Sequence, residues 1–142
     1  MNDSYETKAA LLAAKENSTL PIMASMSFEA NGRTFTGCTV ESFAATARGL
    51  GANAVGINCS LGPKEIFPMA KRLAEAVPGD FPVFVKPNAG LPTITETGEA
   101  VYSMGPEAFV RHMQALKASG AALLGGCCGT TPEFIAAMRS LK

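Results

Sequence analysis

Residues 53–59, Asn-Ala-Val-Gly-Ile-Asn-Cys, decide the fold, because they form a short apolar run that leads directly into a cysteine. Such a nearly continuous apolar run, without alternation of polar residues, is typical of a strand buried on both faces in a parallel sheet. Three other runs have the same character, at residues 20–26, 81–86 and 121–125. We therefore predict four parallel strands.

Helical patterns separate the predicted strands. They lie at about residues 3–17, 39–50, 64–77, 106–119 and from 131 onward. Alternation of strands and helices about every 30 to 40 residues is expected of βα units. Four such units are half of an eight-stranded barrel with its helices outside. We predict one α/β domain over residues 1–142, built as half of a (β/α)₈ barrel; a small open α/β sheet is the competing architecture.

Composition excludes several classes of protein. The chain has 142 residues, of which 47% are hydrophobic, and its 12 basic residues balance its 12 acidic ones. No broad electrostatic field therefore favours nucleic acid or an anionic membrane. No apolar run approaches the roughly 18 residues of a membrane span, and the first residues lack the features of a secretion signal. We expect a soluble cytoplasmic protein with neither nucleic-acid nor membrane partners.

Three of the four cysteines come directly after predicted strands. Cys59 comes directly after the second strand, and Cys127 and Cys128 come directly after the fourth. Barrels place their chemistry at these carboxyl ends of strands. Adjacent side chains in a strand point to opposite faces, but the flanking Gly126 and Gly129 allow the chain to turn and direct both thiols inward.

Three thiolates around one Zn²⁺ leave a fourth tetrahedral position open, as in catalytic zinc sites. The net charge of −1 makes the metal a weak Lewis acid, better suited to holding a substrate thiolate than to generating hydroxide. This pattern favours transfer of an electrophilic carbon group to a thiol. Three alternatives stay open: inert buried cysteines, a vicinal redox disulfide between Cys127 and Cys128, and a phosphate-binding loop over residues 125–131.

Three stretches carry a resemblance to a known family: GINCSLGP (56–63), KPNAGLP (86–92) and GGCCGTTPEFI (125–135). They resemble the homocysteine S-methyltransferase family. PIMASMSFEANGRTFTGC (21–38) and the lysine of KPNAG are most similar to the homocysteine-binding module of cobalamin-dependent methionine synthases. The resemblance implies a (β/α)₈ barrel in which these four units correspond to strands five to eight.

By motif, the resemblance implies that Cys59, Cys127 and Cys128 hold zinc. It also implies zinc-dependent methyl transfer to the thiol of homocysteine, giving methionine, with methylcobalamin as donor on a separate module. Cobalamin and folate modules are then partners. The family's first four strands, with a Glu-Thr motif that helps to hold the homocysteine amino group, lie outside this sequence. We therefore expect association with an N-terminal half-barrel or with a second copy. The alternative is a truncated, non-catalytic zinc-binding half-barrel or assembly domain.

Two asparagines are further candidates. Asn58 precedes Cys59, and Asn88 lies in the connection after the third strand. We expect both to bind substrate or to orient ligands, as groups around a metal centre do. The connection over residues 87–105 is long for a barrel and is expected to be a functional lid or a loop without regular structure.

Overall fold

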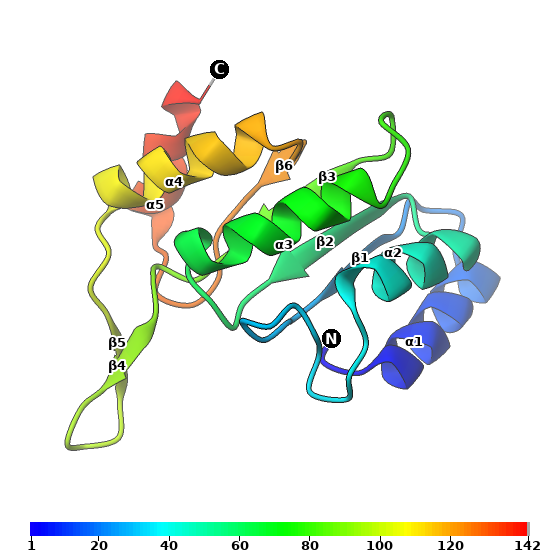
Figure 1. Cartoon of the computed structure of the whole chain (residues 1–142), viewed down its shortest axis with the longest axis horizontal. Coiled ribbons are helices and arrows are strands. Elements are labelled where there is room, and N and C mark those ends of the chain that lie inside the picture. Colours follow the sequence, from blue (N-terminus) through cyan, green and yellow to red (C-terminus); the bar gives the residue numbers. More distant parts are fainter. Residues whose placement is uncertain (142) are drawn as a thin grey trace.

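A sheet of four parallel strands forms the centre of the computed structural model, which describes residues 1–141 (Figure 1). Its strands, in spatial order, are β1 (Met23–Met26), β2 (Ala54–Asn58), β3 (Val83–Lys86) and β6 (Leu123–Leu124). All four predicted strands are present, and each is shorter than its apolar run. The prediction of a parallel sheet is confirmed.

Five α-helices occupy the segments where helical patterns were found. They are α1 (Ser4–Asn17), α2 (Val40–Gly49), α3 (Pro63–Glu75), α4 (Pro106–Ala118) and α5 (Pro132–Ala137), and a 3₁₀ turn, η1 (Met138–Ser140), follows the last. Local chemistry explains where they begin. The Asp3 side chain accepts hydrogen bonds from the first backbone N–H groups of α1, and the Thr39 side chain caps α2 in the same way. The last three α-helices begin with proline, whose fixed φ suits the first helical position.

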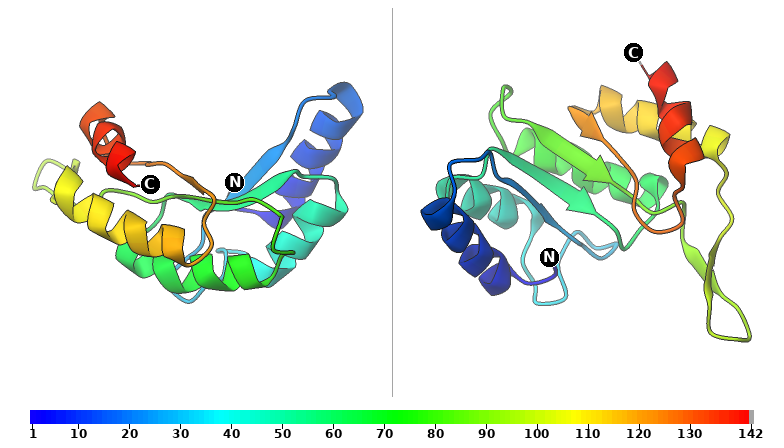
Figure 2. Two further views of the ribbon diagram at one scale, coloured as in Figure 1. Left: turned by 90° about the horizontal axis from the view of Figure 1, so that it is seen from above. Right: turned by 180° about the vertical axis from the view of Figure 1, so that it is seen from behind.

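Strand order distinguishes the two architectures that the sequence allowed. The strands follow one another in the sheet in chain order, and α2, α3 and α4 lie on the same face of it, with α1 and α5 at its two sides (Figure 2). A doubly wound open sheet would instead reverse its strand order and carry helices on both faces. Sequential order with helices on one face is the arrangement of a barrel wall. The chain is therefore part of a barrel.

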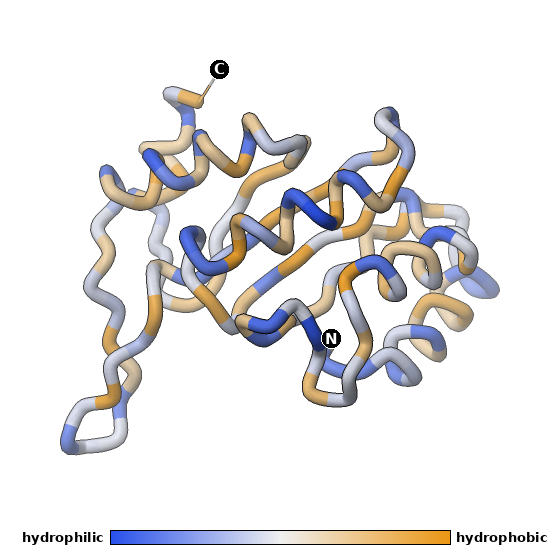
Figure 3. Tube along the Cα trace, viewed as in Figure 1, coloured by the Kyte–Doolittle hydropathy of each residue, from blue (hydrophilic) through white to orange (hydrophobic). Residues whose placement is uncertain are grey.

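The hydrophobic core lies between the sheet and these helices. Val55, Ile57 and Val85 point toward the helices, where each is at most 1% exposed. Their helical neighbours are the buried apolar side chains of α2, α3 and α4: Val40, Phe43, Ile66, Leu73, Phe109, Met113 and Leu116. The hydropathy colouring of Figure 3 shows the central strands as largely apolar. Burial of this surface is what holds the helices on the sheet.

The opposite face of the sheet, called the inner face below, has no helix over it in the described part of the chain. Its side chains alternate with those of the core, so Met23, Phe84 and Leu123 belong to it. Met23 and Leu123 are about half exposed, whereas Phe84 is buried because its ring lies across the backbone of Gly56 on the next strand. In a complete barrel this face points to the barrel axis.

The long connection after β3 has regular structure that we did not predict. It contains β4 (Pro92–Ile94) and β5 (Ala100–Tyr102), which pair as an antiparallel hairpin. Figure 1 shows this hairpin extending from the body of the molecule at the end where the strands finish. The expectation of a loop without regular structure was wrong. Two short runs of β-forming residues flank the turn at residues 95–98 and pair with each other.

The described helices are too short or too polar to cross a lipid bilayer.

Gly56 provides a test of how closely the strands pack. A Cβ atom there would lie 2.5 Å from both the backbone oxygen and a ring carbon of Phe84. We expect Gly56→Ala to lower the free energy of unfolding by about 1 to 3 kcal/mol, as overpacking does. Gly49→Ala is the control, because nothing lies within 4 Å of a Cβ there and alanine favours the helix. Urea denaturation of both variants measures the difference, and equal stabilities would contradict the packing described here.

Candidate metal centre

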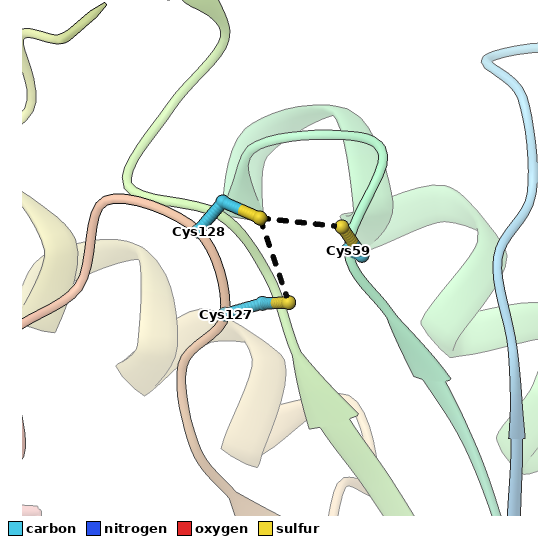
Figure 4. A group of neighbouring side chains, drawn as sticks. All are labelled: Cys59, Cys127 and Cys128. Carbon is cyan, nitrogen blue, oxygen red and sulfur yellow. Dashed lines mark hydrogen bonds between the residues drawn. The ribbon is translucent and has the colours of Figure 1, made fainter. Parts of the chain in front are cut away.

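Three cysteine side chains meet at the carboxyl end of the sheet (Figure 4). The Sγ atoms of Cys59 and Cys128 are 3.6 Å apart, and those of Cys127 and Cys128 are 4.0 Å apart. All three sulfur atoms lie within 4.8 Å of one another, and the set can hold a metal ion. The fourth cysteine, Cys38, does not join them; its sulfur contacts the carbonyl oxygen of Thr39.

The turn after β2 directs Cys59 into this group. Cys59 and Ser60 both have left-handed backbone angles, with φ of 59° and 61°. Two consecutive non-glycine residues in this region are unfavourable, and such strain concentrates at functional sites. The backbone N–H of Cys59 donates to the carbonyl of Lys86 at 3.0 Å, which holds the turn against β3. Nothing in the sequence reveals this turn, because neither residue is a glycine.

A second turn allows both adjacent cysteines to face the same point. Gly129, which follows them, has a φ of 77°, so it supplies the left-handed angle that we expected of a glycine here. Gly126 is not in the left-handed region. Its function is steric instead, because a Cβ atom on Gly126 would overlap the side chain of Thr130.

The segment Lys86–Ala89, which leaves β3, joins the two cysteine turns. The carbonyl of Lys86 accepts from the N–H of Cys59, and the carbonyl of Pro87 accepts from the N–H of Cys127 at 2.8 Å. Two further bonds hold Cys128: its N–H donates to Oδ1 of Asn88 at 3.1 Å, and its carbonyl accepts from the N–H of Ala89 at 2.9 Å. This segment therefore sets the separation of the three sulfurs.

The thiols of Cys59 and Cys127 do not titrate alike. Burial raises the pKa of Cys59, but the N–H of Ser60 and the nearby groups of Cys127, Cys128 and Asn88 together lower it below its ordinary value. Burial, with a hydrogen bond to Cys59 and the negative charge there, raises the pKa of Cys127 to about 11. Without a cation, then, Cys59 ionises more readily than Cys127, and a bound cation would have to displace the proton of Cys127.

The two predicted asparagines lie at different places. Asn88 is buried, and its Oδ1 is engaged by Cys128. Asn58 is the register partner of Lys86 on the inner face, and its buried Oδ1 lacks a hydrogen-bond partner in the described part of the protein. A substrate-binding role for either residue stays a prediction, but Asn88 has a clear structural one.

Tyr102 of β5 is a neighbour of the thiols that sequence reasoning missed. Its ring packs on the backbone of Gly129, where a Cβ atom would overlap it. Burial and then the adjacent group of Cys128 raise the pKa of Tyr102. The hairpin thus brings an aromatic side chain to the edge of the thiol cluster. A tyrosine in a long connection gives no signal of this kind in the sequence.

The alternative of a phosphate-binding loop at residues 125–131 is weakened by the hydrogen bonds of that loop. Phosphate loops need backbone N–H groups that are free to face the anion. Here the N–H groups of Cys127, Cys128 and Thr130 already donate within the protein. The α5 helix that follows has only six residues.

Solved structures with a similar fold include the homocysteine methyltransferase MmuM from Escherichia coli. Its apo form aligns with a TM-score of 0.77 and 22% sequence identity, over 99% of this chain and 47% of that one. Its metallated form aligns with a TM-score of 0.76 and 21% identity, over 100% of this chain and 43% of that one. This chain therefore has the fold of somewhat less than half of that protein.

Sequence comparisons agree with the fold. The methionine synthase of Mycobacterium leprae (strain TN) is 32% identical over 139 residues, which is 94% of this chain and 11% of that protein. The methionine synthase of Mycobacterium tuberculosis (strain ATCC 25618 / H37Rv) is 32% identical over 150 residues, which is 99% of this chain and 12% of that protein. A sequence model described as homocysteine S-methyltransferase matches residues 1–141. The chain belongs to the homocysteine S-methyltransferase family.

Proposed function

We propose that this chain is the zinc-holding half of a homocysteine S-methyltransferase barrel of the methionine synthase type, which transfers a methyl group to the thiol of homocysteine and forms methionine. The observation that carries the proposal is the convergence of Cys59, Cys127 and Cys128 at the carboxyl end of a parallel sheet. Membership in the family supports the reaction class.

The spacing of the sulfurs fits zinc. Tetrahedral coordination with Zn–S bonds of about 2.3 Å puts two sulfur ligands about 3.8 Å apart. The Sγ separations of Cys59–Cys128 and Cys127–Cys128, 3.6 and 4.0 Å, lie on either side of that value, and all three sulfurs lie within 4.8 Å of one another. The donor set also fits, because thiolates are the ligands of zinc rather than of magnesium or calcium. Cys59, Cys127 and Cys128 would hold the ion and leave one position open.

When bound, zinc would keep the homocysteine sulfur as a thiolate in that open position. The chain's own residues supply what surrounds it. Asn88 orients Cys128 through its backbone N–H, and the carbonyls of Lys86 and Pro87 fix the other two cysteines. The Tyr102 ring packs on Gly129, at the edge of the cluster. In the reaction a bond forms between sulfur and the methyl carbon, the pair of electrons of the broken bond remains with the donor, and the thiol proton goes to solvent.

The methyl donor in this proposal is methylcobalamin on a separate module. A folate module would supply the cobalamin with a new methyl group after each transfer. The resemblance of residues 21–38 and 86–92 to cobalamin-dependent methionine synthases supports this choice. The mycobacterial methionine synthases are far longer than the region they share with this chain, which leaves room in those proteins for further modules.

The first prediction from this proposal concerns metal content. We expect the chain to bind one zinc ion, and Cys59→Ser, Cys127→Ser or Cys128→Ser to weaken binding by at least about 100-fold, because each removes one of three thiolate ligands. Cys38→Ser is the matched control and should bind zinc like the wild type, since Cys38 lies outside the cluster. Elemental analysis measures the zinc content of each protein, and competition with a chromophoric chelator measures its affinity for zinc.

Cobalt substitution separates the enzyme from a simple zinc-binding domain. Adding homocysteine to the Co²⁺ form should strengthen the thiolate-to-metal charge-transfer absorption, because a fourth sulfur joins the metal. An unchanged spectrum in a protein that holds the metal would refute the transferase proposal and favour the alternative of a non-catalytic zinc-binding or assembly domain.

A second prediction concerns pH. Because the pKa of Cys127 is raised to about 11, this thiol carries its proton at neutral pH and the metal must displace it. The affinity for zinc should therefore rise with pH, by at least about tenfold per pH unit between about pH 6 and 8 for one displaced proton. Chelator competition at several pH values tests this, and an affinity independent of pH would show that no protonated thiol is a ligand.

We further propose that a complementary set of four βα units, or failing that a second copy of this chain, closes the barrel against the inner face. The edge strands β1 and β6 have no neighbour on their outer sides in the described residues, and such edges are a liability when left open. Half-exposed Met23 and Leu123 provide apolar surface for the contact.

A third prediction follows. If a second copy closes the barrel, the purified chain should have a mass by light scattering well above 14.7 kDa at micromolar concentration. Met23→Lys should reduce the association, because it buries a charge in the contact. Leu12→Lys, at an exposed position of α1, should leave the mass unchanged. A folded, zinc-binding monomer for the wild type would contradict closure of the barrel by a second copy.

A further inference from the structure

The β4–β5 hairpin has one side without a polar or charged aliphatic residue. Its register forms three pairs: Pro92 with Tyr102, Thr93 with Val101, and Ile94 with Ala100. Side chains alternate along a strand and register partners share a side, so the first and third pairs lie on one side of the hairpin and the second pair on the other. The first side, called the apolar side below, consists of Pro92, Ile94, Ala100 and Tyr102.

The base of the apolar side is fixed next to the thiol cluster. The Tyr102 ring packs on the backbone of Gly129, which directly follows Cys128. Just before the hairpin, the N–H of Ala89 donates to the carbonyl of Cys128 at 2.9 Å. Both ends of the hairpin are therefore attached to the cysteine turn after β6. From there the hairpin extends beyond the carboxyl end of the sheet (Figure 1).

The outer part of the apolar side is open to solvent. Ile94 is 63% exposed, and Pro92 and Ala100 are exposed as well. These residues adjoin one another on one side of the hairpin, so the exposed apolar surface is continuous rather than scattered. Continuous surface of this kind marks a site of contact with another molecule. A two-stranded hairpin also gains stability when its apolar side is covered.

The turn at the tip keeps the hairpin in shape. The N–H of Thr95 donates to the carbonyl of Glu99 at 2.9 Å, and the N–H of Gly98 donates to the carbonyl of Thr95 at 3.0 Å. The N–H of Glu99 donates in turn to Oγ1 of Thr95 at 3.0 Å. Because the tip is hydrogen-bonded within itself, the apolar side is already formed before a partner arrives, which lowers the entropic cost of binding.

The charges of this segment have one sign. Residues 87–110 include Glu96, Glu99 and Glu107 but neither lysine nor arginine. Glu96 and Glu99 belong to the tip and are exposed. A partner that complements the hairpin therefore has apolar side chains opposite Ile94 and basic side chains opposite the tip, because complementary charges favour encounter and fix orientation.

We infer that the apolar side of the hairpin is the docking surface for the protein module that carries the methyl donor. Such a module has to bring its methyl group to the thiol cluster, and a protein that sits on Ile94 and Ala100 lies next to the turn that carries Cys128. The mycobacterial methionine synthases share only 11% and 12% of their length with this chain, so each has ample further sequence for such a module. This inference rests on the proposed function, because it presupposes a donor held on a separate module.

The test measures how tightly a methylcobalamin-loaded cobalamin-binding module of a methionine synthase binds to the zinc-loaded full chain, by isothermal titration calorimetry. We expect Ile94→Ser to weaken binding by about ten- to 100-fold, the effect of losing one buried isoleucine side chain. Val101→Ser is the matched control. It also replaces a β-branched, half-exposed residue of the hairpin, but on the opposite side, so it should bind the module like the wild type.

A charge reversal tests the complementarity of the tip. Glu96→Lys should weaken binding of the module at low salt, because it places a positive charge opposite basic side chains, and the difference from the wild type should shrink as salt is added. Glu75→Lys, at an exposed position of α3 away from the hairpin, is the charge-matched control and should bind like the wild type. Equal effects of the two reversals would refute a docking contact at the tip.

Failure of this inference and failure of the proposed function give different results. If homocysteine alters the spectrum of the cobalt form but the chain does not bind the module, the docking surface is refuted and the proposed function stands. If homocysteine leaves that spectrum unchanged, the proposed function fails and this inference with it. Equal weakening by Ile94→Ser and Val101→Ser would also refute the docking surface, since both would then act through the stability of the hairpin. A loss of self-association in Ile94→Ser, with binding of the module unchanged, would show instead that a second copy covers the apolar side.

Discussion

The candidate metal centre depends on one short segment, Lys86–Ala89, that is hydrogen-bonded to both cysteine turns. Its backbone and the side chain of Asn88 contact the polar backbone groups of Cys59, Cys127 and Cys128. The two turns are almost 70 residues apart in the chain, and their sulfurs approach to 3.6 Å. Since β3 lies between β2 and β6 in the sheet, its exit segment is placed to connect them.

The centre combines features that each cost stability when no metal is present. Cys59 and Ser60 are held in left-handed conformations, and burial, together with the neighbouring thiols, raises the pKa of Cys127. A cation would relieve the crowding, because it replaces the mutual repulsion of sulfur charges by attraction to one positive centre. The proposed metal is thus coupled to the local backbone geometry, as functional sites often couple strain to ligand binding.

The inner face of the half-barrel changes in polarity along the strands. Its layers change from apolar, with Phe84 and Leu123, to polar, with Asn58 and Lys86, over a single step toward the metal centre. The apolar layers suit contact with another part of a barrel.

The sequence by itself determined the four parallel strands, the five helices and the three cysteines, because apolar runs, proline and cap residues act locally. It did not determine the strand order that excluded an open sheet, since order depends on contacts between distant segments. Tertiary structure alone decided the left-handed turn at Cys59, the steric function of Gly126, the approach of Tyr102 and the pairing of Asn58 with Lys86. Each results from packing between strands or loops that are far apart in the chain, which no local pattern encodes.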